Sequence, residues 1–254
     1  MTKQRLDNAL VERKLTSSRS QAESYIKLGK VTVDGRVVPK PGHFVGPNSA
    51  VAITAEVQYV SRAGLKLASV ADVFKLDFRD KVVLDVGSST GGFTDYSLKN
   101  GARKVYAVDV GTDQLHPSLR RDKRVESHEK TDIRDVYATA TNHLPSTNYQ
   151  LLNDIPDIVL IDVSFISLRE ILPHLYNHLS GPATQVVAMV KPQFEAGAGQ
   201  TNKGVIKNDS MRRQILRDFE DWARGYFVII DKRDSDVAGA KGNQERFYLL
   251  NKVK

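Results

Sequence analysis

The sequence contains no cysteine, which excludes both a disulfide framework and a metal site built from thiolates. No segment approaches the ~18 consecutive apolar residues of a membrane-spanning helix, and no apolar run follows Met1 to form a secretory signal. The sequence offers no obvious cluster of metal ligands either. We therefore expect a cytoplasmic protein with no membrane partner and no bound metal.

The charge of the chain is unevenly distributed. Residues 1–60 carry nine Lys/Arg against five Asp/Glu, whereas residues 61–254 carry 28 against 25, for a total of +7. This distribution predicts a polyanion-binding module ahead of a nearly balanced domain, with an ordinary basic surface as the alternative on charge alone. The 254 residues, 41% of them hydrophobic, suffice for one α/β domain and a small module.

The rest of the chain is organised around residues 81–94, KVVLDVGSSTGGFT. This stretch predicts a buried strand ending at Asp85, then a glycine-bearing turn, and a helix beginning near Phe93. Such a turn lets a ligand approach the backbone N–H groups at the start of the helix. The expected ligand-binding residues of this stretch are Asp85, Gly87, Ser88, Ser89, Gly91, Gly92 and Phe93.

A carboxylate follows at the spacing expected for ribose binding. Asp109 closes the second apolar strand, 22 positions after Gly87, where it can accept hydrogen bonds from a ribose. Because Ser89 stands in place of the second glycine of the dinucleotide pattern, we expect a nucleoside cofactor without a pyrophosphate, and S-adenosylmethionine is the obvious candidate. Asp132, beside Ile133 in the loop after the third strand region, could reach the adenine amino group. A tight βα turn in another kind of α/β protein is the alternative.

The fold class follows from the alternation of apolar strands with helical or loop segments. Strands are expected over 81–86, 104–110, 157–162, 185–190 and 226–230, which predicts an α/β fold with a Rossmann-like, doubly wound parallel sheet. A last strand over 245–250 predicts a terminal antiparallel hairpin.

Two of these strands end in ionisable residues. Because parallel strands end on one rim, Asp162 and Lys191 should lie beside the cofactor turn. Lys66, in a helix expected over 64–76, and Glu245, at the start of the last strand, complete a candidate set. Either of these two, taken alone, would be an ordinary solvated charge.

The first 60 residues predict a small α+β unit. Two short helical patterns lie within 3–28, with a capping candidate at 16–19, and Asp34-Gly35 predicts a hairpin turn. Residues 56–62 are interpreted as a linker. Arg5-Leu6-Asp7, Ser18-Arg19, Ala22 and the run from Ile26 to Gly35 resemble the RNA-binding domain named after ribosomal protein S-four.

That resemblance implies that basic residues of the helical face contact RNA phosphates and sugars, which supplies affinity but little sequence reading. The positions carried over are Lys3, Arg5, Arg19 and Lys30, and Arg62 is a further RNA-binding candidate.

The candidate set also carries a resemblance. Lys66, Asp162, Lys191 and Glu245 occur in the order and contexts of the Lys-Asp-Lys-Glu tetrad of FtsJ-like ribose methyltransferases. The contexts SRAGLKL, DVSFIS, VKPQFE and GNQE are similar to those of the haemolysin A/TlyA family, which joins an S-four-type domain, here 1–60, to a methyltransferase domain, here 61–254. The resemblance implies methyl transfer from S-adenosylmethionine to a ribose 2′-hydroxyl of ribosomal RNA, either free or in ribosomal subunits.

The tetrad suits this chemistry. A ribose hydroxyl is a poor nucleophile, and free lysine, with a pKa of about 10.4, is an inefficient base at neutral pH unless a second ammonium and desolvation act on it. We assign Lys191 as the hydroxyl-orienting residue and base, Lys66 as its cationic neighbour, and Asp162 and Glu245 as holders of the two amines.

Three other functions remain as alternatives at this stage. A base-modifying RNA methyltransferase would share the cofactor turn but would not need the two lysines, and an RNA-binding assembly factor would keep the pocket without turnover. A pore-former, which the family name suggests, is disfavoured by the absence of an apolar span and of a strongly amphipathic basic helix.

Overall fold

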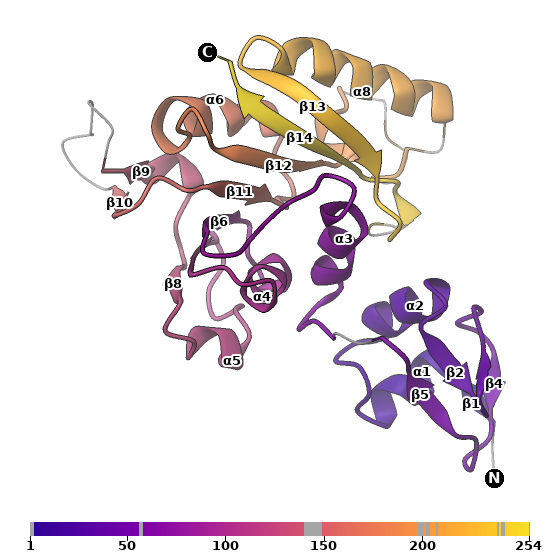
Figure 1. Cartoon of the computed structure of the whole chain (residues 1–254). Coiled ribbons are helices and arrows are strands. Elements are labelled where there is room, and N and C mark those ends of the chain that lie inside the picture. Colours follow the sequence, from indigo (N-terminus) through magenta and orange to yellow (C-terminus); the bar gives the residue numbers. More distant parts are fainter. Residues whose placement is uncertain are drawn as a thin grey trace.

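The structure is a computed structural model that describes residues 3–55, 58–139, 149–197, 201, 204–206, 208–237, 239 and 242–253. Its centre is a seven-stranded sheet in the order β13-β14-β12-β11-β6-β7-β8 (Figure 1). The strands of this sheet are β6 (Val82–Val86), β7 (Lys104–Val108), β8 (Val125–His128), β11 (Ile158–Ile161), β12 (Gln185–Val190), β13 (Phe227–Asp234) and β14 (Arg246–Lys252).

The sheet is parallel from β8 to β12, and β14 runs antiparallel to both β12 and β13. The predicted doubly wound sheet and its terminal hairpin are therefore confirmed. Several predicted boundaries were wrong. The second apolar strand, β7, ends at Val108, β11 ends at Ile161, β13 continues to Asp234 and Glu245 lies just before β14. The helix expected over 64–76 is α3 (Arg62–Ala71). Strand β8 lies where the third strand region was expected, before Asp132, but no bounds were predicted for it, because its sequence VESH is short and polar.

Helices cover both faces of the sheet. On one face lie α3 (Arg62–Ala71), α4 (Gly92–Lys99) and α5 (Pro117–Arg120), and on the other α6 (Leu172–His174), the π-helical η3 (Leu175–Leu179) and α8 (Asp209–Ala223). The remaining short elements are η1 (Ile133–Asp135), β9 (Val136–Ala138), β10 (Gln150–Leu152), η2 (Leu168–Glu170) and α7 (Pro192–Glu195). The apolar run of β6 is buried along its whole length, as expected for a central strand covered on both faces.

Residues 3–55, called the N-terminal module below, form a separate small core. Its helices α1 (Leu6–Glu12) and α2 (Arg19–Lys27) pack on the antiparallel strands β3-β2-β5, and β1 pairs with β4. The strand bounds are β1 (Gln4–Arg5), β2 (Val31–Val33), β3 (Arg36–Val37), β4 (Phe44–Val45) and β5 (Val51–Ile53). Both local predictions are confirmed: Ser18 caps α2 by accepting from the Gln21 N–H, and Asp34-Gly35 forms the β2–β3 turn with both φ angles positive.

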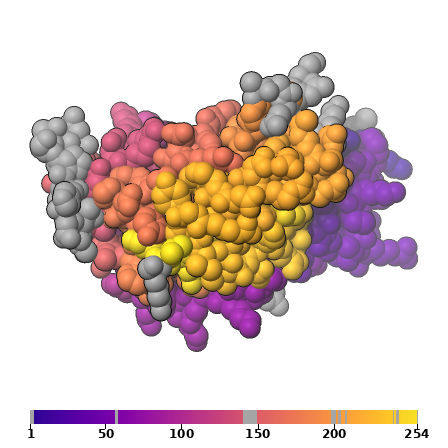
Figure 2. Space-filling model, turned by 90° about the horizontal axis from the view of Figure 1, so that it is seen from above, coloured from indigo at the N-terminus to yellow at the C-terminus, as the bar shows by residue number. Residues whose placement is uncertain are grey.

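The module contacts the rest of the chain directly. Leu65 of α3 and Val237 pack into its apolar core, and the Gln21 amide donates to the Tyr59 carbonyl at 2.7 Å. Figure 2 shows the module, in indigo and purple, at one end of the molecule. Of the expected linker, residues 56 and 57 lie outside the described residues, and Arg62 already belongs to α3. Within the described residues no helix is long and apolar enough to cross a membrane.

Helices α3 and α4 approach each other most closely at two glycines. A Cβ on Gly92 would lie 2.7 Å from the Cβ of Ala63 and 2.8 Å from the backbone nitrogen of Gly64. Only glycine permits this crossing, which places Lys66 of α3 beside the turn that opens α4.

We predict that Gly92→Ala lowers the free energy of unfolding by about 1–3 kcal/mol, the usual cost of overpacking, because two backbones must move apart. Urea denaturation measures this. The matched control is Gly46→Ala, since a Cβ there would meet only the Ser49 hydroxyl at 3.7 Å and should change stability by less than ~0.5 kcal/mol. Equal stability of the two variants would contradict the prediction.

Candidate active site

The turn after β6 brings the chain back against the neighbouring strand β11. Gly87 has a φ of +81°, and a Cβ there would lie 2.7 Å from the carbonyl oxygen of Asp162. The turn continues through Ser89, whose N–H donates to Asp109 at 2.7 Å. The ends of β6, β7 and β11 are therefore joined at one rim of the sheet, as the sequence predicted.

A cavity of about 360 Å³ opens at this rim. Five of the expected cofactor residues line it: Gly87, Ser89, Asp109, Asp132 and Ile133. The wall opposite them comes from the segment that follows β11, residues 162–166. We call this space the rim cavity.

The two carboxylates of the rim cavity are fixed by their own contacts. Asp109 accepts from the N–H groups of Ser89 and Gly111, both at 2.7 Å. Asp132 caps η1 and pairs with Arg134 at 2.7 Å, and the hydrogen bond from Arg134 holds the pKa of Asp132 below its usual range. Both side chains are thus held in one orientation before any ligand arrives.

A second cavity, of about 600 Å³, adjoins the first and shares Gly87, Ser89, Asp162 and Ser164 with it. Lys66, Asp162, Lys191 and Glu245 all line it, together with the expected cofactor residues Asp85, Ser88 and Phe93. We call this space the tetrad cavity. Gly91 and Gly92 are not among the residues lining either cavity: Gly91 lies against Leu115 and Leu119, and Gly92 against α3, so both serve packing.

The tetrad forms two ion pairs. Lys66 Nζ pairs with Glu245, and Lys191 Nζ lies 2.6 Å from Asp162 and donates to the Ser164 hydroxyl at 2.8 Å. Lys66 and Glu245 are 4% and 2% exposed, and Lys191 is also buried. A buried ammonium without a counter-charge would be costly, so each lysine has its own carboxylate from a different element.

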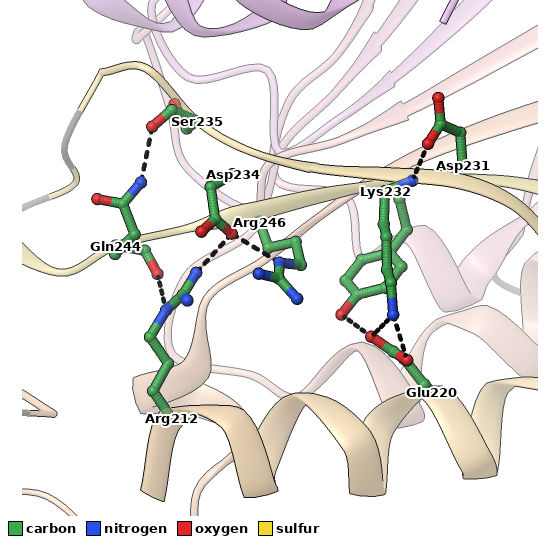
Figure 3. A network of polar contacts seen from close by, with 9 residues as sticks. Arg212, Glu220, Asp231, Lys232, Asp234, Ser235, Gln244 and Arg246 are labelled. Atoms are coloured by element: carbon green, nitrogen blue, oxygen red, sulfur yellow. Dashed lines mark hydrogen bonds and ion pairs between the residues drawn. The ribbon is translucent and has the colours of Figure 1, made fainter. Parts of the chain in front are cut away.

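The two neighbours of Glu245 in the sequence, Gln244 and Arg246, belong to a polar network (Figure 3). Asp234 of β13 pairs at 2.6 Å with both Arg212 of α8 and Arg246 of β14, and Arg212 also donates to the Gln244 carbonyl at 3.1 Å. The residues on each side of Glu245 are therefore fixed to α8 and β13. This explains how a charged residue just outside a strand keeps one orientation.

Two family models match the chain. Residues 4–51 match the S4 domain, and residues 59–252 match the FtsJ-like methyltransferase. The chain belongs to the FtsJ-like methyltransferase family. The family resemblance drawn from the sequence is thereby confirmed.

Relatives that match nearly the whole chain agree with this family assignment. Hemolysin A of Brachyspira hyodysenteriae is 38% identical over 97% of this chain and 98% of that protein. The 16S/23S rRNA (cytidine-2'-O)-methyltransferase TlyA of Mycobacterium tuberculosis is 38% identical over 97% of this chain and 89% of its own. A solved structure of a hemolysin-like protein from Streptococcus thermophilus has a TM-score of 0.72 at 37% identity, covering 100% of this chain and 90% of that one.

The FtsJ-like domain carries one exposed aromatic residue that the sequence analysis did not single out. Phe165, between β11 and η2, is 92% exposed, has a φ of +67° and stacks only against Phe194, with ring centroids 5.3 Å apart. Its neighbour Ser164 touches Lys191. The motif DVSFIS contains both residues, but exposure of an aromatic side chain has no sequence signature.

The basic candidates of the N-terminal module lie in different environments. Lys3 and Lys30 are exposed, whereas Arg5 and Arg19 both pair with the buried Asp7, at 2.7 and 3.0 Å. Burial alone would raise the pKa of Asp7, but the hydrogen bonds from the two arginines outweigh it and lower the pKa. Arg62 donates to the Ser20 hydroxyl at 2.7 Å and lines the tetrad cavity with Ser17 and Ser18, so the module supplies part of the cavity wall.

A buried carboxylate, that of Asp85 in β6, joins this strand to α4. Asp85 accepts from the N–H and the hydroxyl of Thr94, at 2.9 and 2.6 Å, while its other oxygen has no hydrogen-bond partner among the described residues. Burial raises the pKa of Asp85 to about 7, and the charges of Asp162 and Asp109 act in the same direction. Asp85 therefore binds a proton in the folded protein over a pH range where the unfolded chain has lost it.

We predict that Asp85→Asn becomes progressively more stable relative to the wild type as the pH rises from about 4 to about 7, with no further change above. The folded wild type retains a proton that the unfolded chain, with a pKa near 3.8, has released, so ionisation of Asp85 opposes folding. The gain is at most about 4 kcal/mol, since one pKa unit corresponds to about 1.4 kcal/mol. Urea denaturation at pH 5, 6, 7 and 8 measures it, and a constant difference between the two proteins would refute the prediction.

Proposed function

We propose that this protein transfers a methyl group from S-adenosylmethionine to a ribose 2′-hydroxyl of ribosomal RNA in the cytoplasm. The observation that carries the proposal is the pair of buried lysine–carboxylate contacts in the wall of a cavity that adjoins the rim cavity. A base-modifying enzyme with the same cofactor turn has no need of two such lysines. The relative from Mycobacterium tuberculosis, named as a cytidine-2'-O-methyltransferase, supports the same reaction.

The rim cavity fits the cofactor. Gly87 leaves room where a Cβ would meet Asp162, Asp109 offers oxygens beside the turn for a ribose, and Asp132 with Ile133 closes the far end for an adenine. Asp85 and Ser88 line the tetrad cavity, where a cationic methionine group would need partners. When bound, S-adenosylmethionine supplies an electrophilic methyl group on a sulfonium leaving group.

The tetrad would orient the acceptor and remove its proton. Lys191 is aimed by Asp162 and Ser164. Once its ammonium has released a proton to solvent, the neutral amine can hydrogen-bond the 2′-hydroxyl and accept its proton as the methyl group arrives. Asp162 would then hold the ammonium that forms. Lys66, paired with Glu245, would be its cationic neighbour.

The N-terminal module would dock the RNA. We propose that residues 1–60, which include the module, form the docking unit and that residues 61–254 form the catalytic domain. The residues proposed to contact RNA phosphates are Lys3, Arg5, Arg19, Lys30 and Arg62. Support comes from the positive charge of the module, from the exposure of Lys3 and Lys30, and from the position of Arg62 at the cavity. The match to the S4 domain agrees with this role.

We predict that Lys191→Ala reduces methyl transfer by about 10²-fold or more, because the acceptor loses its orienting group and base. The assay uses labelled S-adenosylmethionine with separated ribosomal subunits and free rRNA, followed by nucleoside analysis. The matched control is Lys232→Ala, because Lys232 pairs with Glu220 and lines neither cavity. Label in a 2′-O-methyl nucleoside supports the proposal, label in a methylated base refutes the assignment of the tetrad, and cofactor binding without any transfer favours an RNA-binding factor.

Phe165 would stack on an unstacked base of the RNA at the mouth of the site. Base–aromatic stacking contributes ~1–3 kcal/mol, so we predict that Phe165→Leu lowers kcat/KM for RNA by about 5- to 100-fold, while Phe165→Trp retains most of the activity. Steady-state kinetics with RNA and calorimetry with the cofactor measure the two effects. If Phe165→Leu weakened only cofactor binding, Phe165 would belong to the wall of the rim cavity instead.

A further inference from the structure

The segment after β11, residues 162–168, carries Asp162, Ser164 and Phe165 but has no regular secondary structure before η2. We call it the acceptor loop. It forms one wall of the rim cavity and contributes Asp162 and Ser164 to the tetrad cavity. A loop with these tasks needs contacts that hold it at ångström precision, because small displacements of reacting groups lower the rate.

Two side-chain contacts of the acceptor loop are made by α7 and by the residue just before it. Lys191 contacts Asp162 and Ser164, and the ring of Phe194 in α7 contacts the ring of Phe165. Both of these contacts use groups that face RNA in the proposed reaction, so they are disturbed whenever substrate enters. A third contact, made by Glu195 at the end of α7, uses none of them.

Glu195 is a buried carboxylate that binds the far end of the acceptor loop. Its side chain is 1% exposed; one oxygen accepts from the Ser167 hydroxyl at 2.6 Å and the other from the Leu168 N–H at 2.7 Å. Arg169 Nε lies 3.8 Å away. Burial raises the pKa of Glu195 above its usual value, while both hydrogen bonds favour the ionised form.

The position of Glu195 separates it from the reacting groups. It lines neither the rim cavity nor the tetrad cavity. Burying a carboxylate is unfavourable unless its hydrogen bonds are satisfied, and here both oxygens are used on the loop. The two donors are adjacent in sequence, so this contact fixes the direction in which the acceptor loop leaves the sheet and enters η2.

We propose that Glu195 is a positioning residue: by holding Ser167 and Leu168 against α7, it sets the distance of Asp162 and Ser164 from Lys191 and keeps Phe165 at the mouth of the site. Its effect on methyl transfer rests on the proposed function, whereas its effect on the loop does not. Glu195 thus joins β12, which leads into Lys191, to β11, which leads into Asp162.

The experiment compares Glu195→Ala and Glu195→Gln with the wild-type full-length chain. Alanine removes both acceptors. The glutamine amide can still accept from the Leu168 N–H through its oxygen and donate to the Ser167 hydroxyl through its nitrogen, so Glu195→Gln should restore most of the function. The readouts are hydrogen exchange of the amides of residues 163–170, cofactor affinity by calorimetry, and the rate of rRNA methylation at saturating cofactor and RNA.

The matched control is Glu220→Ala. Glu220 is also a buried carboxylate with satisfied contacts, to Lys232 and Tyr248, but it lies on α8 and lines neither cavity (Figure 3). In Glu195→Ala we expect the amide hydrogens of the loop to exchange at least tenfold faster, the cofactor to bind several-fold more weakly, and the rate of rRNA methylation to fall at least tenfold. Glu220→Ala should lower the melting temperature while changing these three quantities less than twofold.

Three results would overturn the proposal: unchanged exchange of residues 163–170 in Glu195→Ala, a saturated rate within twofold of the wild type, or equal effects in Glu195→Ala and Glu220→Ala. If Glu195→Ala does not fold, Ser167→Ala removes one of the two donors and must raise exchange at Leu168 and lower the rate. If the wild type methylates no RNA, the proposed function fails, and the exchange and calorimetry data alone decide the role of Glu195.

Discussion

At the centre of the sheet, the backbone of Gly87 lies against the carbonyl of Asp162, where the parallel strands β6 and β11 end side by side. Beyond this point the chain leaves β6 for α4 on one face and leaves β11 for η2 and α6 on the other. The divergence opens a crevice at the carboxyl ends of the strands. Both cavities are lined by Gly87 and Asp162, so a larger residue at Gly87 would disturb the rim cavity and the tetrad cavity together.

Burial of charge then determines which distant segments must meet. Lys66 and Glu245 are separated by 179 positions, and neither could remain charged in the core without the other. Their contact joins α3, next to the N-terminal module, to the start of the last strand. Lys191 and Asp162 make the same kind of link between the ends of β12 and β11. The tetrad residues are therefore the counter-charges that make each other's burial possible.

The sequence predicted the parts of the site that depend on strand order. Alternating apolar strands imply a rim, and Asp109, Asp162 and Lys191 end or follow strands, so their meeting follows from topology. Prediction was weaker where a residue can serve either ligand binding or packing. Gly91 and Gly92 were expected at the ligand, yet they allow the close approach of α4 to its neighbours, since a glycine pattern does not say which of its faces is crowded. The exposure of Phe165 and the raised pKa of Asp85 depend on surroundings that come from several elements, and no local pattern encodes them.

The N-terminal module illustrates a further limit of local patterns. Its charge and its helices were predictable, but its contacts were not, because Leu65 and Val237 are apolar residues of the catalytic half that complete its core. Through these contacts α2 is placed beside α3, and Ser17, Ser18 and Ser20 become part of the tetrad cavity. At this wall the Arg62 guanidinium spans the two units by donating to the Ser20 hydroxyl. The module and the FtsJ-like domain therefore share this wall, and its shape depends on how α2 packs on α3.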